Sequence, residues 1–316
     1  MTHSRSLNSK RSRRFDDWHI QVDSESAILS LAVAALVALT SLSFACAMGT
    51  TPDARSRIRS AEELASHSGF RRLQSSVTDE SSLPVAAWVR PGPSDLDDAA
   101  SVHIYIEGDG LAWQSRRRFS LDPTPVQAIG LRLAAADPSR ATILYLGRPC
   151  QYGFPPTSDC RPIFWTAARY GEAVVDALDR RIDEWVARHG DPRRLTLIGY
   201  SGGGVVAALL AARRDDVRLL VTIAAPLDLA EWTRSTRTSP LVGSLSPMDQ
   251  IETLRNLEQH HFVGRRDRRV PIETTRAFHH ALGPGAPSRF TIVAGMDHSS
   301  WPNLWVILVE ASGLFE

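Results

Sequence analysis

A single hydroxyl stands among glycines at Gly199-Tyr200-Ser201-Gly202-Gly203, which matches the pattern G-x-S-x-G. An apolar, β-branched run precedes this cluster and an alanine-rich run follows it, so the pattern predicts a tight turn between a strand and a helix. Glycine neighbours let the chain fold back on both sides of a strained residue, and the N–H groups of a helix N-terminus can stabilise a developing oxyanion. These features predict that Ser201 is a nucleophile.

Two other interpretations of this turn stay open. The glycines could simply join a strand to a helix, or they could form a phosphate-binding loop. A phosphate-binding loop usually carries a lysine after its glycines, and the only lysine of this chain is Lys10, far from the turn. The nucleophile is therefore the favoured interpretation.

A serine hydroxyl needs a base, and the base needs an acid to orient it. In sheets with this strand–serine–helix arrangement, the acid and the histidine follow the serine along the chain, each after a later strand. Asp267 follows the predicted strand HHFVGR, and His298 follows the predicted strand RFTIVAG. Both positions lie at the carboxyl ends of predicted strands, where open α/β sheets assemble their sites. The spacing predicts a triad of Ser201, His298 and Asp267.

Other residues compete for these roles. Asp228 ends the strand before that of Asp267 and is the alternative acid, whereas Asp297 is expected to be a turn residue whose side chain points away from its neighbour His298. The histidines in predicted strands and helices are expected to be ordinary core or surface residues: His103, His260, His261, His279 and His280.

The elements around these residues alternate between strand and helix, which indicates one α/β domain with a mostly parallel sheet and helices on both faces. The predicted strands cover residues 84–90, at an edge of the sheet, and 102–108, 141–147, 194–200, 217–226, 260–265 and 289–295. The predicted helices cover residues 125–137, 167–190, 202–214 and 273–282, with a last helix at 304–310. The domain is expected to span 83–316, after a polar tether and an N-terminal helix (60–73) in residues 49–82.

The sequence resembles the α/β-hydrolase superfamily, and more narrowly its exported bacterial members that share the segments YIEGDGLAW and GYSGGG. The resemblance covers residues 60–316 and implies an α/β-hydrolase fold. It implies Ser201 as the nucleophile, His298 as general base and then general acid, and Asp267 as the orienting acid.

The resemblance also implies an oxyanion hole formed by two backbone N–H groups, those of Gly202 and Asp109. The family usually has His-Gly after the strand that leads to the second donor, and this chain has Glu107-Gly108 there. An acidic residue, Asp109, therefore occupies the donor position.

The apolar run from Ala27 to Ala47 follows a basic, serine-rich start and is typical of a secretory signal or a membrane anchor. Cys46 lies where bacterial lipoproteins are cleaved and lipidated, but Ser43 replaces the usual leucine, and Ala45-Cys46-Ala47 also fits ordinary signal cleavage. Lipidation of Cys46, soluble export and an uncleaved anchor stay open. Residues 1–48 are expected to lie outside the domain, and the protein is expected in the cell envelope, held to a membrane by its N-terminus.

The expected export affects the predicted redox state of the two remaining cysteines. Cys150 and Cys160 lie close together in a loop rich in proline and glycine, and in an oxidising compartment such a pair favours a disulfide over free thiols. A metal site is not expected, because no histidine or third cysteine lies at ligand spacing.

Together these features predict a serine hydrolase that cleaves an ester or related acyl substrate through an acyl-enzyme, without a metal or an organic cofactor. A peptidase or thioesterase with the same triad, and a non-catalytic envelope binding protein, are the alternatives. The net charge of +1 does not indicate nucleic acid as a partner. The short segment 227–254, where a cap would lie, predicts an open site. Trp113, Trp165 and Trp232 are expected to be packing residues, with Trp113 near enough to the oxyanion loop to line an acyl pocket.

Overall fold

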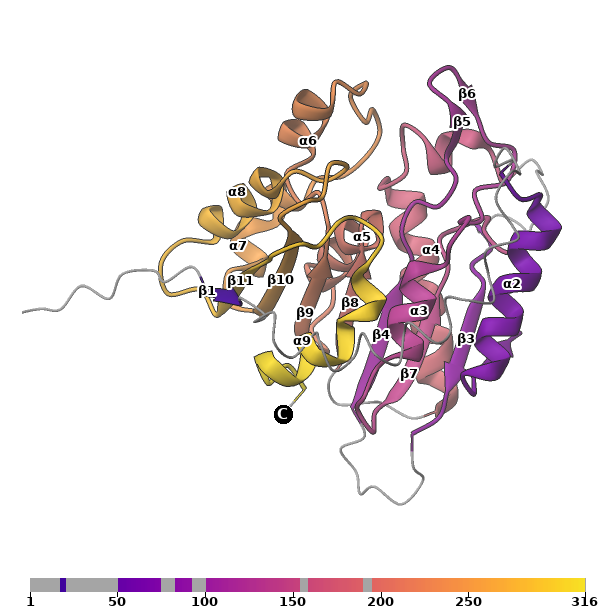
Figure 1. Cartoon of the computed structure of the whole chain (residues 1–316), viewed down its shortest axis with the longest axis horizontal. Coiled ribbons are helices and arrows are strands. Elements are labelled where there is room, and N and C mark those ends of the chain that lie inside the picture. Colours follow the sequence, from indigo (N-terminus) through magenta and orange to yellow (C-terminus); the bar gives the residue numbers. More distant parts are fainter. Residues whose placement is uncertain are drawn as a thin grey trace, which may run out of the picture.

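The computed structural model describes residues 18–20, 51–74, 83–92, 101–153, 159–189 and 195–315. Within these ranges nine strands form one sheet in the order β1-β11-β10-β9-β8-β4-β7-β3-β2 (Figure 1). The strands from β1 to β7 in this order pair in parallel, and β3 and β2 are antiparallel to their neighbours. The strand bounds are β1 Trp18–Ile20, β2 Arg71–Leu73, β3 Ala87–Arg90, β4 Val102–Ile106, β7 Thr142–Leu146, β8 Leu195–Tyr200, β9 Val217–Ile223, β10 Glu258–Gly264 and β11 Ser288–Val293. The predicted α/β architecture with a mostly parallel sheet is confirmed.

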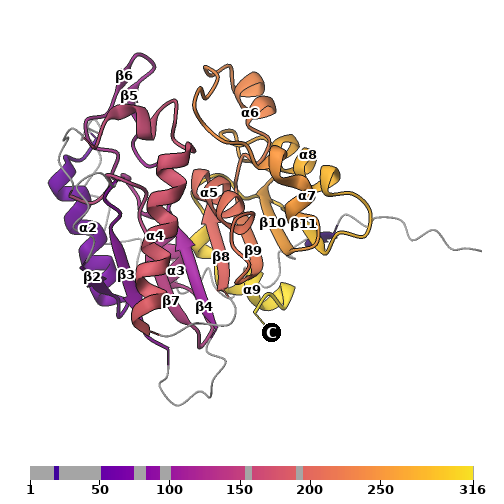
Figure 2. The same ribbon diagram turned by 180° about the vertical axis from the view of Figure 1, so that it is seen from behind.

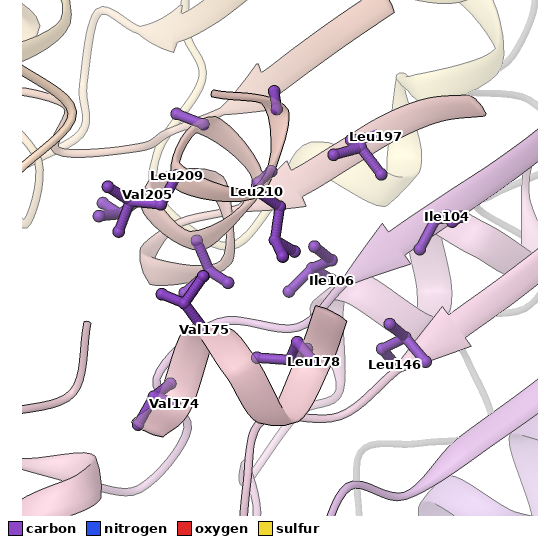
Figure 3. Close-up of a cluster of buried hydrophobic side chains, with 14 of the residues drawn as sticks. Ile104, Ile106, Leu146, Val174, Val175, Leu178, Leu197, Val205, Leu209 and Leu210 are labelled. Carbon is purple, nitrogen blue, oxygen red and sulfur yellow. The ribbon is translucent and has the colours of Figure 1, made fainter. Parts of the chain in front are cut away.

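Helices cover both faces of the sheet, which explains why its central strands are buried along almost their whole length. All six residues of β8 are buried. Helices α4 (Glu172–His189), α5 (Gly202–Ala211) and α8 (Ile272–Leu282) pack on one face, and α2 (Ala54–His67), α3 (Ile129–Ala135) and α9 (Trp305–Ser312) pack on the other (Figures 1 and 2). Figure 3 shows the core beneath α4 and α5, where Val175 and Leu178 meet Val205, Leu210 and Ile106.

The remaining elements lie mostly at the carboxyl edge of the sheet. A separate hairpin of β5 (Trp113–Ser115) and β6 (Arg118–Phe119) follows β4. Helix α6 (Leu229–Thr236), the 3₁₀ turn η3 (Pro247–Gln250) and α7 (Ile251–Leu254) occupy the short segment where a cap would lie. Two further 3₁₀ turns are η2 (Pro162–Trp165) and η4 (Trp301–Asn303).

The structure corrects several predicted boundaries. Strand β3 is not an edge strand, because β2 pairs on its outer side. The N-terminal helix begins earlier than predicted, at Ala54, because the Asp53 side chain accepts a hydrogen bond from the Ser56 N–H and caps it. Residues 71–73 of the predicted helix belong to β2. Helix α3 begins at Ile129 rather than near residue 125.

The N-terminal segment is only partly described. Three of its residues form β1 beside β11. The apolar run 27–47 and Cys46 lie outside the described residues. No helix within the described ranges is long and apolar enough to cross a membrane.

Candidate active site

Ser201 lies between the end of β8 and the start of α5 in a strained conformation, with φ 52° and ψ −125°. A non-glycine residue in this region carries backbone strain, which persists only where surrounding contacts impose it. Here the Ser201 N–H donates to the Ile223 oxygen across 2.8 Å, and the Ser201 oxygen accepts from the Gly204 N–H across 2.9 Å. A β-carbon on Gly199 would collide with the backbone of Gly203, so the turn requires glycine there. The sequence pattern and the strained turn agree.

His298 and Asp267 lie on the loops after β11 and β10, as predicted, and the structure brings them together. The Nδ1 atom of His298 lies 2.7 Å from Oδ2 of Asp267. A carboxylate only accepts hydrogen bonds, so Nδ1 carries the proton and Nε2 is the basic nitrogen of the neutral ring. The other carboxylate oxygen accepts the N–H groups of Arg269 and Val270 across 2.8 and 3.0 Å, which fixes the carboxylate in place.

Tyr200 connects the serine turn to the histidine loop. Its hydroxyl donates to the His298 backbone oxygen across 2.8 Å, and the two rings lie 5.3 Å apart between centroids. Burial raises the pKa of Tyr200, so the hydroxyl remains a donor. The residue before the serine therefore holds the histidine loop against the same edge of the sheet.

The competing acids have other functions in the structure. The Asp228 side chain caps α6 by accepting the Glu231 N–H across 2.9 Å. Asp297 is exposed and accepts from the N–H groups of Ser299 and Ser300, so it is the expected turn residue. The contact of His298 thus favours Asp267 over Asp228 as the orienting acid.

The competing histidines lie in the core or on the surface, as expected. His260 and His261 are buried in β10 and bond to Thr291 and Thr222. Burial lowers the pKa of His260 to about 3, which keeps it neutral. His103 is buried against Asp137, and the ring of His279 stacks on Phe290.

The loop after β4, the predicted second half of the oxyanion hole, is held by two buried side chains. The Glu107 carboxylate accepts the Gly108 N–H across 2.9 Å, and the Gln151 side chain donates to the Gly108 oxygen across 3.1 Å. A β-carbon added to Gly108 would lie 3.4 Å from Cβ of Ser201, so this loop lies directly beside the serine. In a trans peptide the C=O and the next N–H point in opposite directions. The Asp109 N–H therefore points away from Gln151.

The acidic side chain of Asp109 is neutralised by a cluster of buried partners. Its carboxylate accepts from Arg148 across 3.0 Å and from Arg169 and the Tyr170 hydroxyl across 2.9 Å each. Burial alone would raise the pKa of Asp109, but Arg169 and Arg148 outweigh it and the pKa lies below its ordinary value. The carboxylate packs on Gly202, where a β-carbon would collide with it. An acidic residue at this loop is thus explained by its pairing.

Arg148 and Gln151 come from one turn after β7, and the predicted disulfide closes it. Cys150 and Cys160 are bonded, with their Cα atoms 5.6 Å apart, so this prediction is confirmed. Cys150 and Tyr152, on either side of Gln151, have φ values of 67° and 65°. Left-handed conformations at two non-glycine residues indicate that tertiary contacts impose this turn.

Helix α6 reaches across the same edge of the sheet. The indole N–H of Trp232 donates to the Arg269 oxygen across 2.8 Å, and the Arg169 guanidinium lies 6.0 Å from its ring centroid. Trp232 therefore joins the loop of Asp267 to the cluster around Asp109. Trp165 is buried as expected, but Trp113 is 44% exposed on the β5–β6 hairpin and is not a packing residue.

Sequence reasoning missed the residues that hold the oxyanion loop. At Glu107 the sequence departs from the usual His-Gly of the family, and this departure marks the loop as unusual. Gln151, Arg148 and Arg169 carry no local pattern that would associate them with residues 108 and 109. Their roles depend on contacts between segments about 40 to 60 positions apart.

The comparisons with known proteins bear on the fold. No protein-family model and no curated protein matches the sequence. The Pyrococcus horikoshii acylaminoacyl peptidase is 15% identical over 76% of this chain and 41% of its own, with a TM-score of 0.56. A puromycin hydrolase is 17% identical over 73% of this chain and 37% of its own, with a TM-score of 0.54. A puromycin-hydrolyzing peptidase from Mycobacterium tuberculosis is 15% identical over 77% of this chain and 39% of its own, with a TM-score of 0.51.

This chain thus matches about two fifths of the length of each of these proteins. At such low identity the similarity is one of fold. With the sheet order described above and a strained serine between β8 and α5, it identifies the chain as a protein of the α/β-hydrolase fold.

Proposed function

We propose that this protein is a serine hydrolase that cleaves esters or related acyl compounds through an acyl-enzyme. Ser201 attacks the acyl carbon, Nε2 of His298 takes the hydroxyl proton, and Asp267 holds the ring and stabilises its positive charge. The same nitrogen then returns the proton to the leaving group, and water releases the acid. The observation that carries the proposal is the strained serine at the N-terminus of α5, on the edge where His298 meets Asp267.

The oxyanion in this mechanism is bound by backbone N–H groups. The N–H of Gly202 belongs to the first turn of α5, where helix N–H groups face the developing charge. The N–H of Asp109 is the second donor, and its direction is set by the bond between Gln151 and the Gly108 oxygen. The acidic side chain does not oppose this function, because Arg148 and Arg169 neutralise it.

Labelling with a fluorophosphonate probe tests the nucleophile. The wild-type protein should react at one serine, and Ser201→Ala should abolish the reaction while leaving the far-UV circular dichroism unchanged. Ser299→Ala, a change at an exposed serine next to His298, is the matched control and should label like the wild type. Undiminished labelling of Ser201→Ala would refute the assignment.

A peptidase is the second candidate, because two of the solved structures similar in fold are named as peptidases. The same triad cleaves esters and amides, so the mechanism above serves both. Turnover of a panel of p-nitrophenyl esters, thioesters and aminoacyl amides separates the classes. A kcat/KM for amides that matches or exceeds that for esters would favour the peptidase.

We also propose that the protein is exported and held to the envelope membrane by its N-terminal segment. The support is the basic start, the apolar run 27–47 and Cys46 near its end. Intact mass spectrometry of the purified protein tests lipidation: a mature chain that begins at Met48, or an uncleaved chain without lipid, would exclude it.

A further inference from the structure

The β5–β6 hairpin concentrates exposed apolar side chains at the carboxyl edge of the sheet. It begins four residues after Asp109 and, like α6, projects from that edge in both views (Figures 1 and 2). Trp113 pairs with Phe119 across the two strands, so their side chains lie on the same face of the hairpin, and they are 44% and 43% exposed.

Other exposed apolar residues belong to the same region. Leu121 and Val126, on the segment that follows the hairpin, are 63% and 45% exposed, and Ile163 of η2 is 45% exposed. The indole N–H of Trp165, also in η2, donates to the Ser120 oxygen across 3.0 Å and ties η2 to the base of the hairpin. Five of the eight large apolar side chains that are exposed within the described ranges thus lie in this one region, which we call the hairpin surface (Trp113, Phe119, Leu121, Val126 and Ile163).

The tip of the hairpin is strongly basic. Arg116, Arg117 and Arg118 are consecutive and exposed. The Arg118 guanidinium donates to the neutral amide of Gln114 across 2.7 Å, so this contact leaves its charge in place. A basic tip next to exposed aromatic rings is the combination that binds the interface of an anionic bilayer: the cations meet lipid phosphates and the rings enter the headgroup region.

The course of the N-terminal chain places a bilayer near the same surface. Arg57, in the first turn of α2, donates to the backbone oxygens of Asp122 and Thr124, just beyond the hairpin. The amino end of α2 therefore lies at the hairpin base. Six residues, 48–53, lie between the end of the apolar run at Ala47 and Ala54, so seven Cα–Cα steps connect the two. A fully extended chain of that length spans at most about 25 Å. An N-terminus held in a membrane keeps the hairpin surface close to it.

We propose that the hairpin surface docks on the anionic face of the bilayer that holds the N-terminus. Docking turns the carboxyl edge, with Ser201, toward the lipid. Helix α2 is packed on the sheet, with Arg57, Ala61 and Ala65 buried, so residues 54–67 do not form a free spacer that would hold the domain away. This inference rests on the proposed membrane attachment and is independent of the proposed hydrolase chemistry.

Hydrogen–deuterium exchange of the full chain in lipid nanodiscs tests the proposal. One set of discs contains phosphatidylcholine alone and the other contains phosphatidylcholine with phosphatidylglycerol, so the N-terminal attachment is the same in both. Amides of residues 111–121 should exchange at least about threefold more slowly in the anionic discs, because lipid contact excludes water and stabilises the hairpin. Equal exchange in the two discs would overturn the proposal.

Charge reversal at the tip provides the matched pair of variants. Arg117→Glu should remove most of the difference in amide exchange between the two kinds of disc. Arg140→Glu is an equal change of charge at an exposed residue near the opposite edge of the sheet, and it should retain that difference. Trp113→Ser should also reduce the protection, and Ile307→Ser, at an exposed apolar residue of α9, should not. Protection that appears without lipid and rises with protein concentration would show that a second copy covers the surface, and would refute bilayer docking. None of these readouts requires catalytic activity.

Discussion

The Gln151 side-chain amide donates to the Gly108 backbone oxygen across 3.1 Å, from inside a turn closed by a disulfide. This one contact orients the peptide group whose N–H belongs to Asp109, the proposed second oxyanion donor. Gln151 touches no reacting atom in the proposed mechanism. It is therefore a positioning residue, and its effect on the rate should depend on how much negative charge the substrate oxygen develops.

Gln151→Glu replaces the donor by a carboxylate that can only accept, so the Gly108 peptide loses its orienting partner. We expect kcat/KM for an ester to fall about tenfold or more. For the matching thionoester the fall should be much smaller, because sulfur is a weak acceptor and gains little from the oxyanion hole. Gln127→Glu, a change at an exposed glutamine, is the control. Equal losses for both substrates would indicate general damage to the site.

Asp267→Asn should lower kcat by about four orders of magnitude, because the imidazole loses the partner that fixes its tautomer and balances its charge. Asp228→Asn should leave the rate within a few-fold of the wild type, since Asp228 caps α6. Steady-state kinetics on one activated ester compare the two variants. The opposite ranking would transfer the orienting role to Asp228.

Asp109→Asn should destabilise the protein in a pH-dependent manner. The folded-state pKa of Asp109 lies below its ordinary value of 3.8, so its contribution is fully present above that pH and is lost as the pH falls through the depressed folded value. Near neutral pH the variant leaves Arg148 and Arg169 without their counter-ion, which should cost roughly 3 kcal/mol of unfolding free energy.

Urea unfolding at a series of pH values measures this contribution. The difference in unfolding free energy between the wild type and Asp109→Asn should be largest above pH 3.8 and should shrink in more acidic solution. Asp249→Asn, at an exposed aspartate, should show little difference at any pH. A difference for Asp109→Asn that stays constant with pH would mean that the charge is not the cause.

Reduction of the disulfide should weaken both stability and catalysis. Opening the Cys150–Cys160 loop is expected to lower the unfolding free energy by roughly 2 to 3 kcal/mol. The rate should fall as well, because Gln151 is anchored next to Cys150. A gain of about two hydrogens in mass reports the reduction, and reductant should leave the double variant Cys150→Ser/Cys160→Ser unaffected. Full activity after complete reduction would separate the disulfide from the oxyanion loop.

The sequence was informative where function leaves a local pattern. Glycines at fixed spacing around Ser201 mark a turn that few other residues permit, and His298 and Asp267 each follow the end of a predicted strand. Strand β2 and the β5–β6 hairpin escaped prediction because they are short, and their sequences RRL and WQSRRRF have no clear period. The residues around Asp109 could not be predicted either, because the fold brings together positions that no pattern in the chain associates.

In the proposed exported hydrolase, the disulfide-closed turn would also determine when the active site is complete. A newly made chain in a reducing compartment lacks the bond between Cys150 and Cys160, and with it the firm placement of Gln151 beside the oxyanion loop. Oxidation after export would then complete the catalytic geometry as a step of maturation. Such timing would spare the acyl compounds of the cell that makes the enzyme.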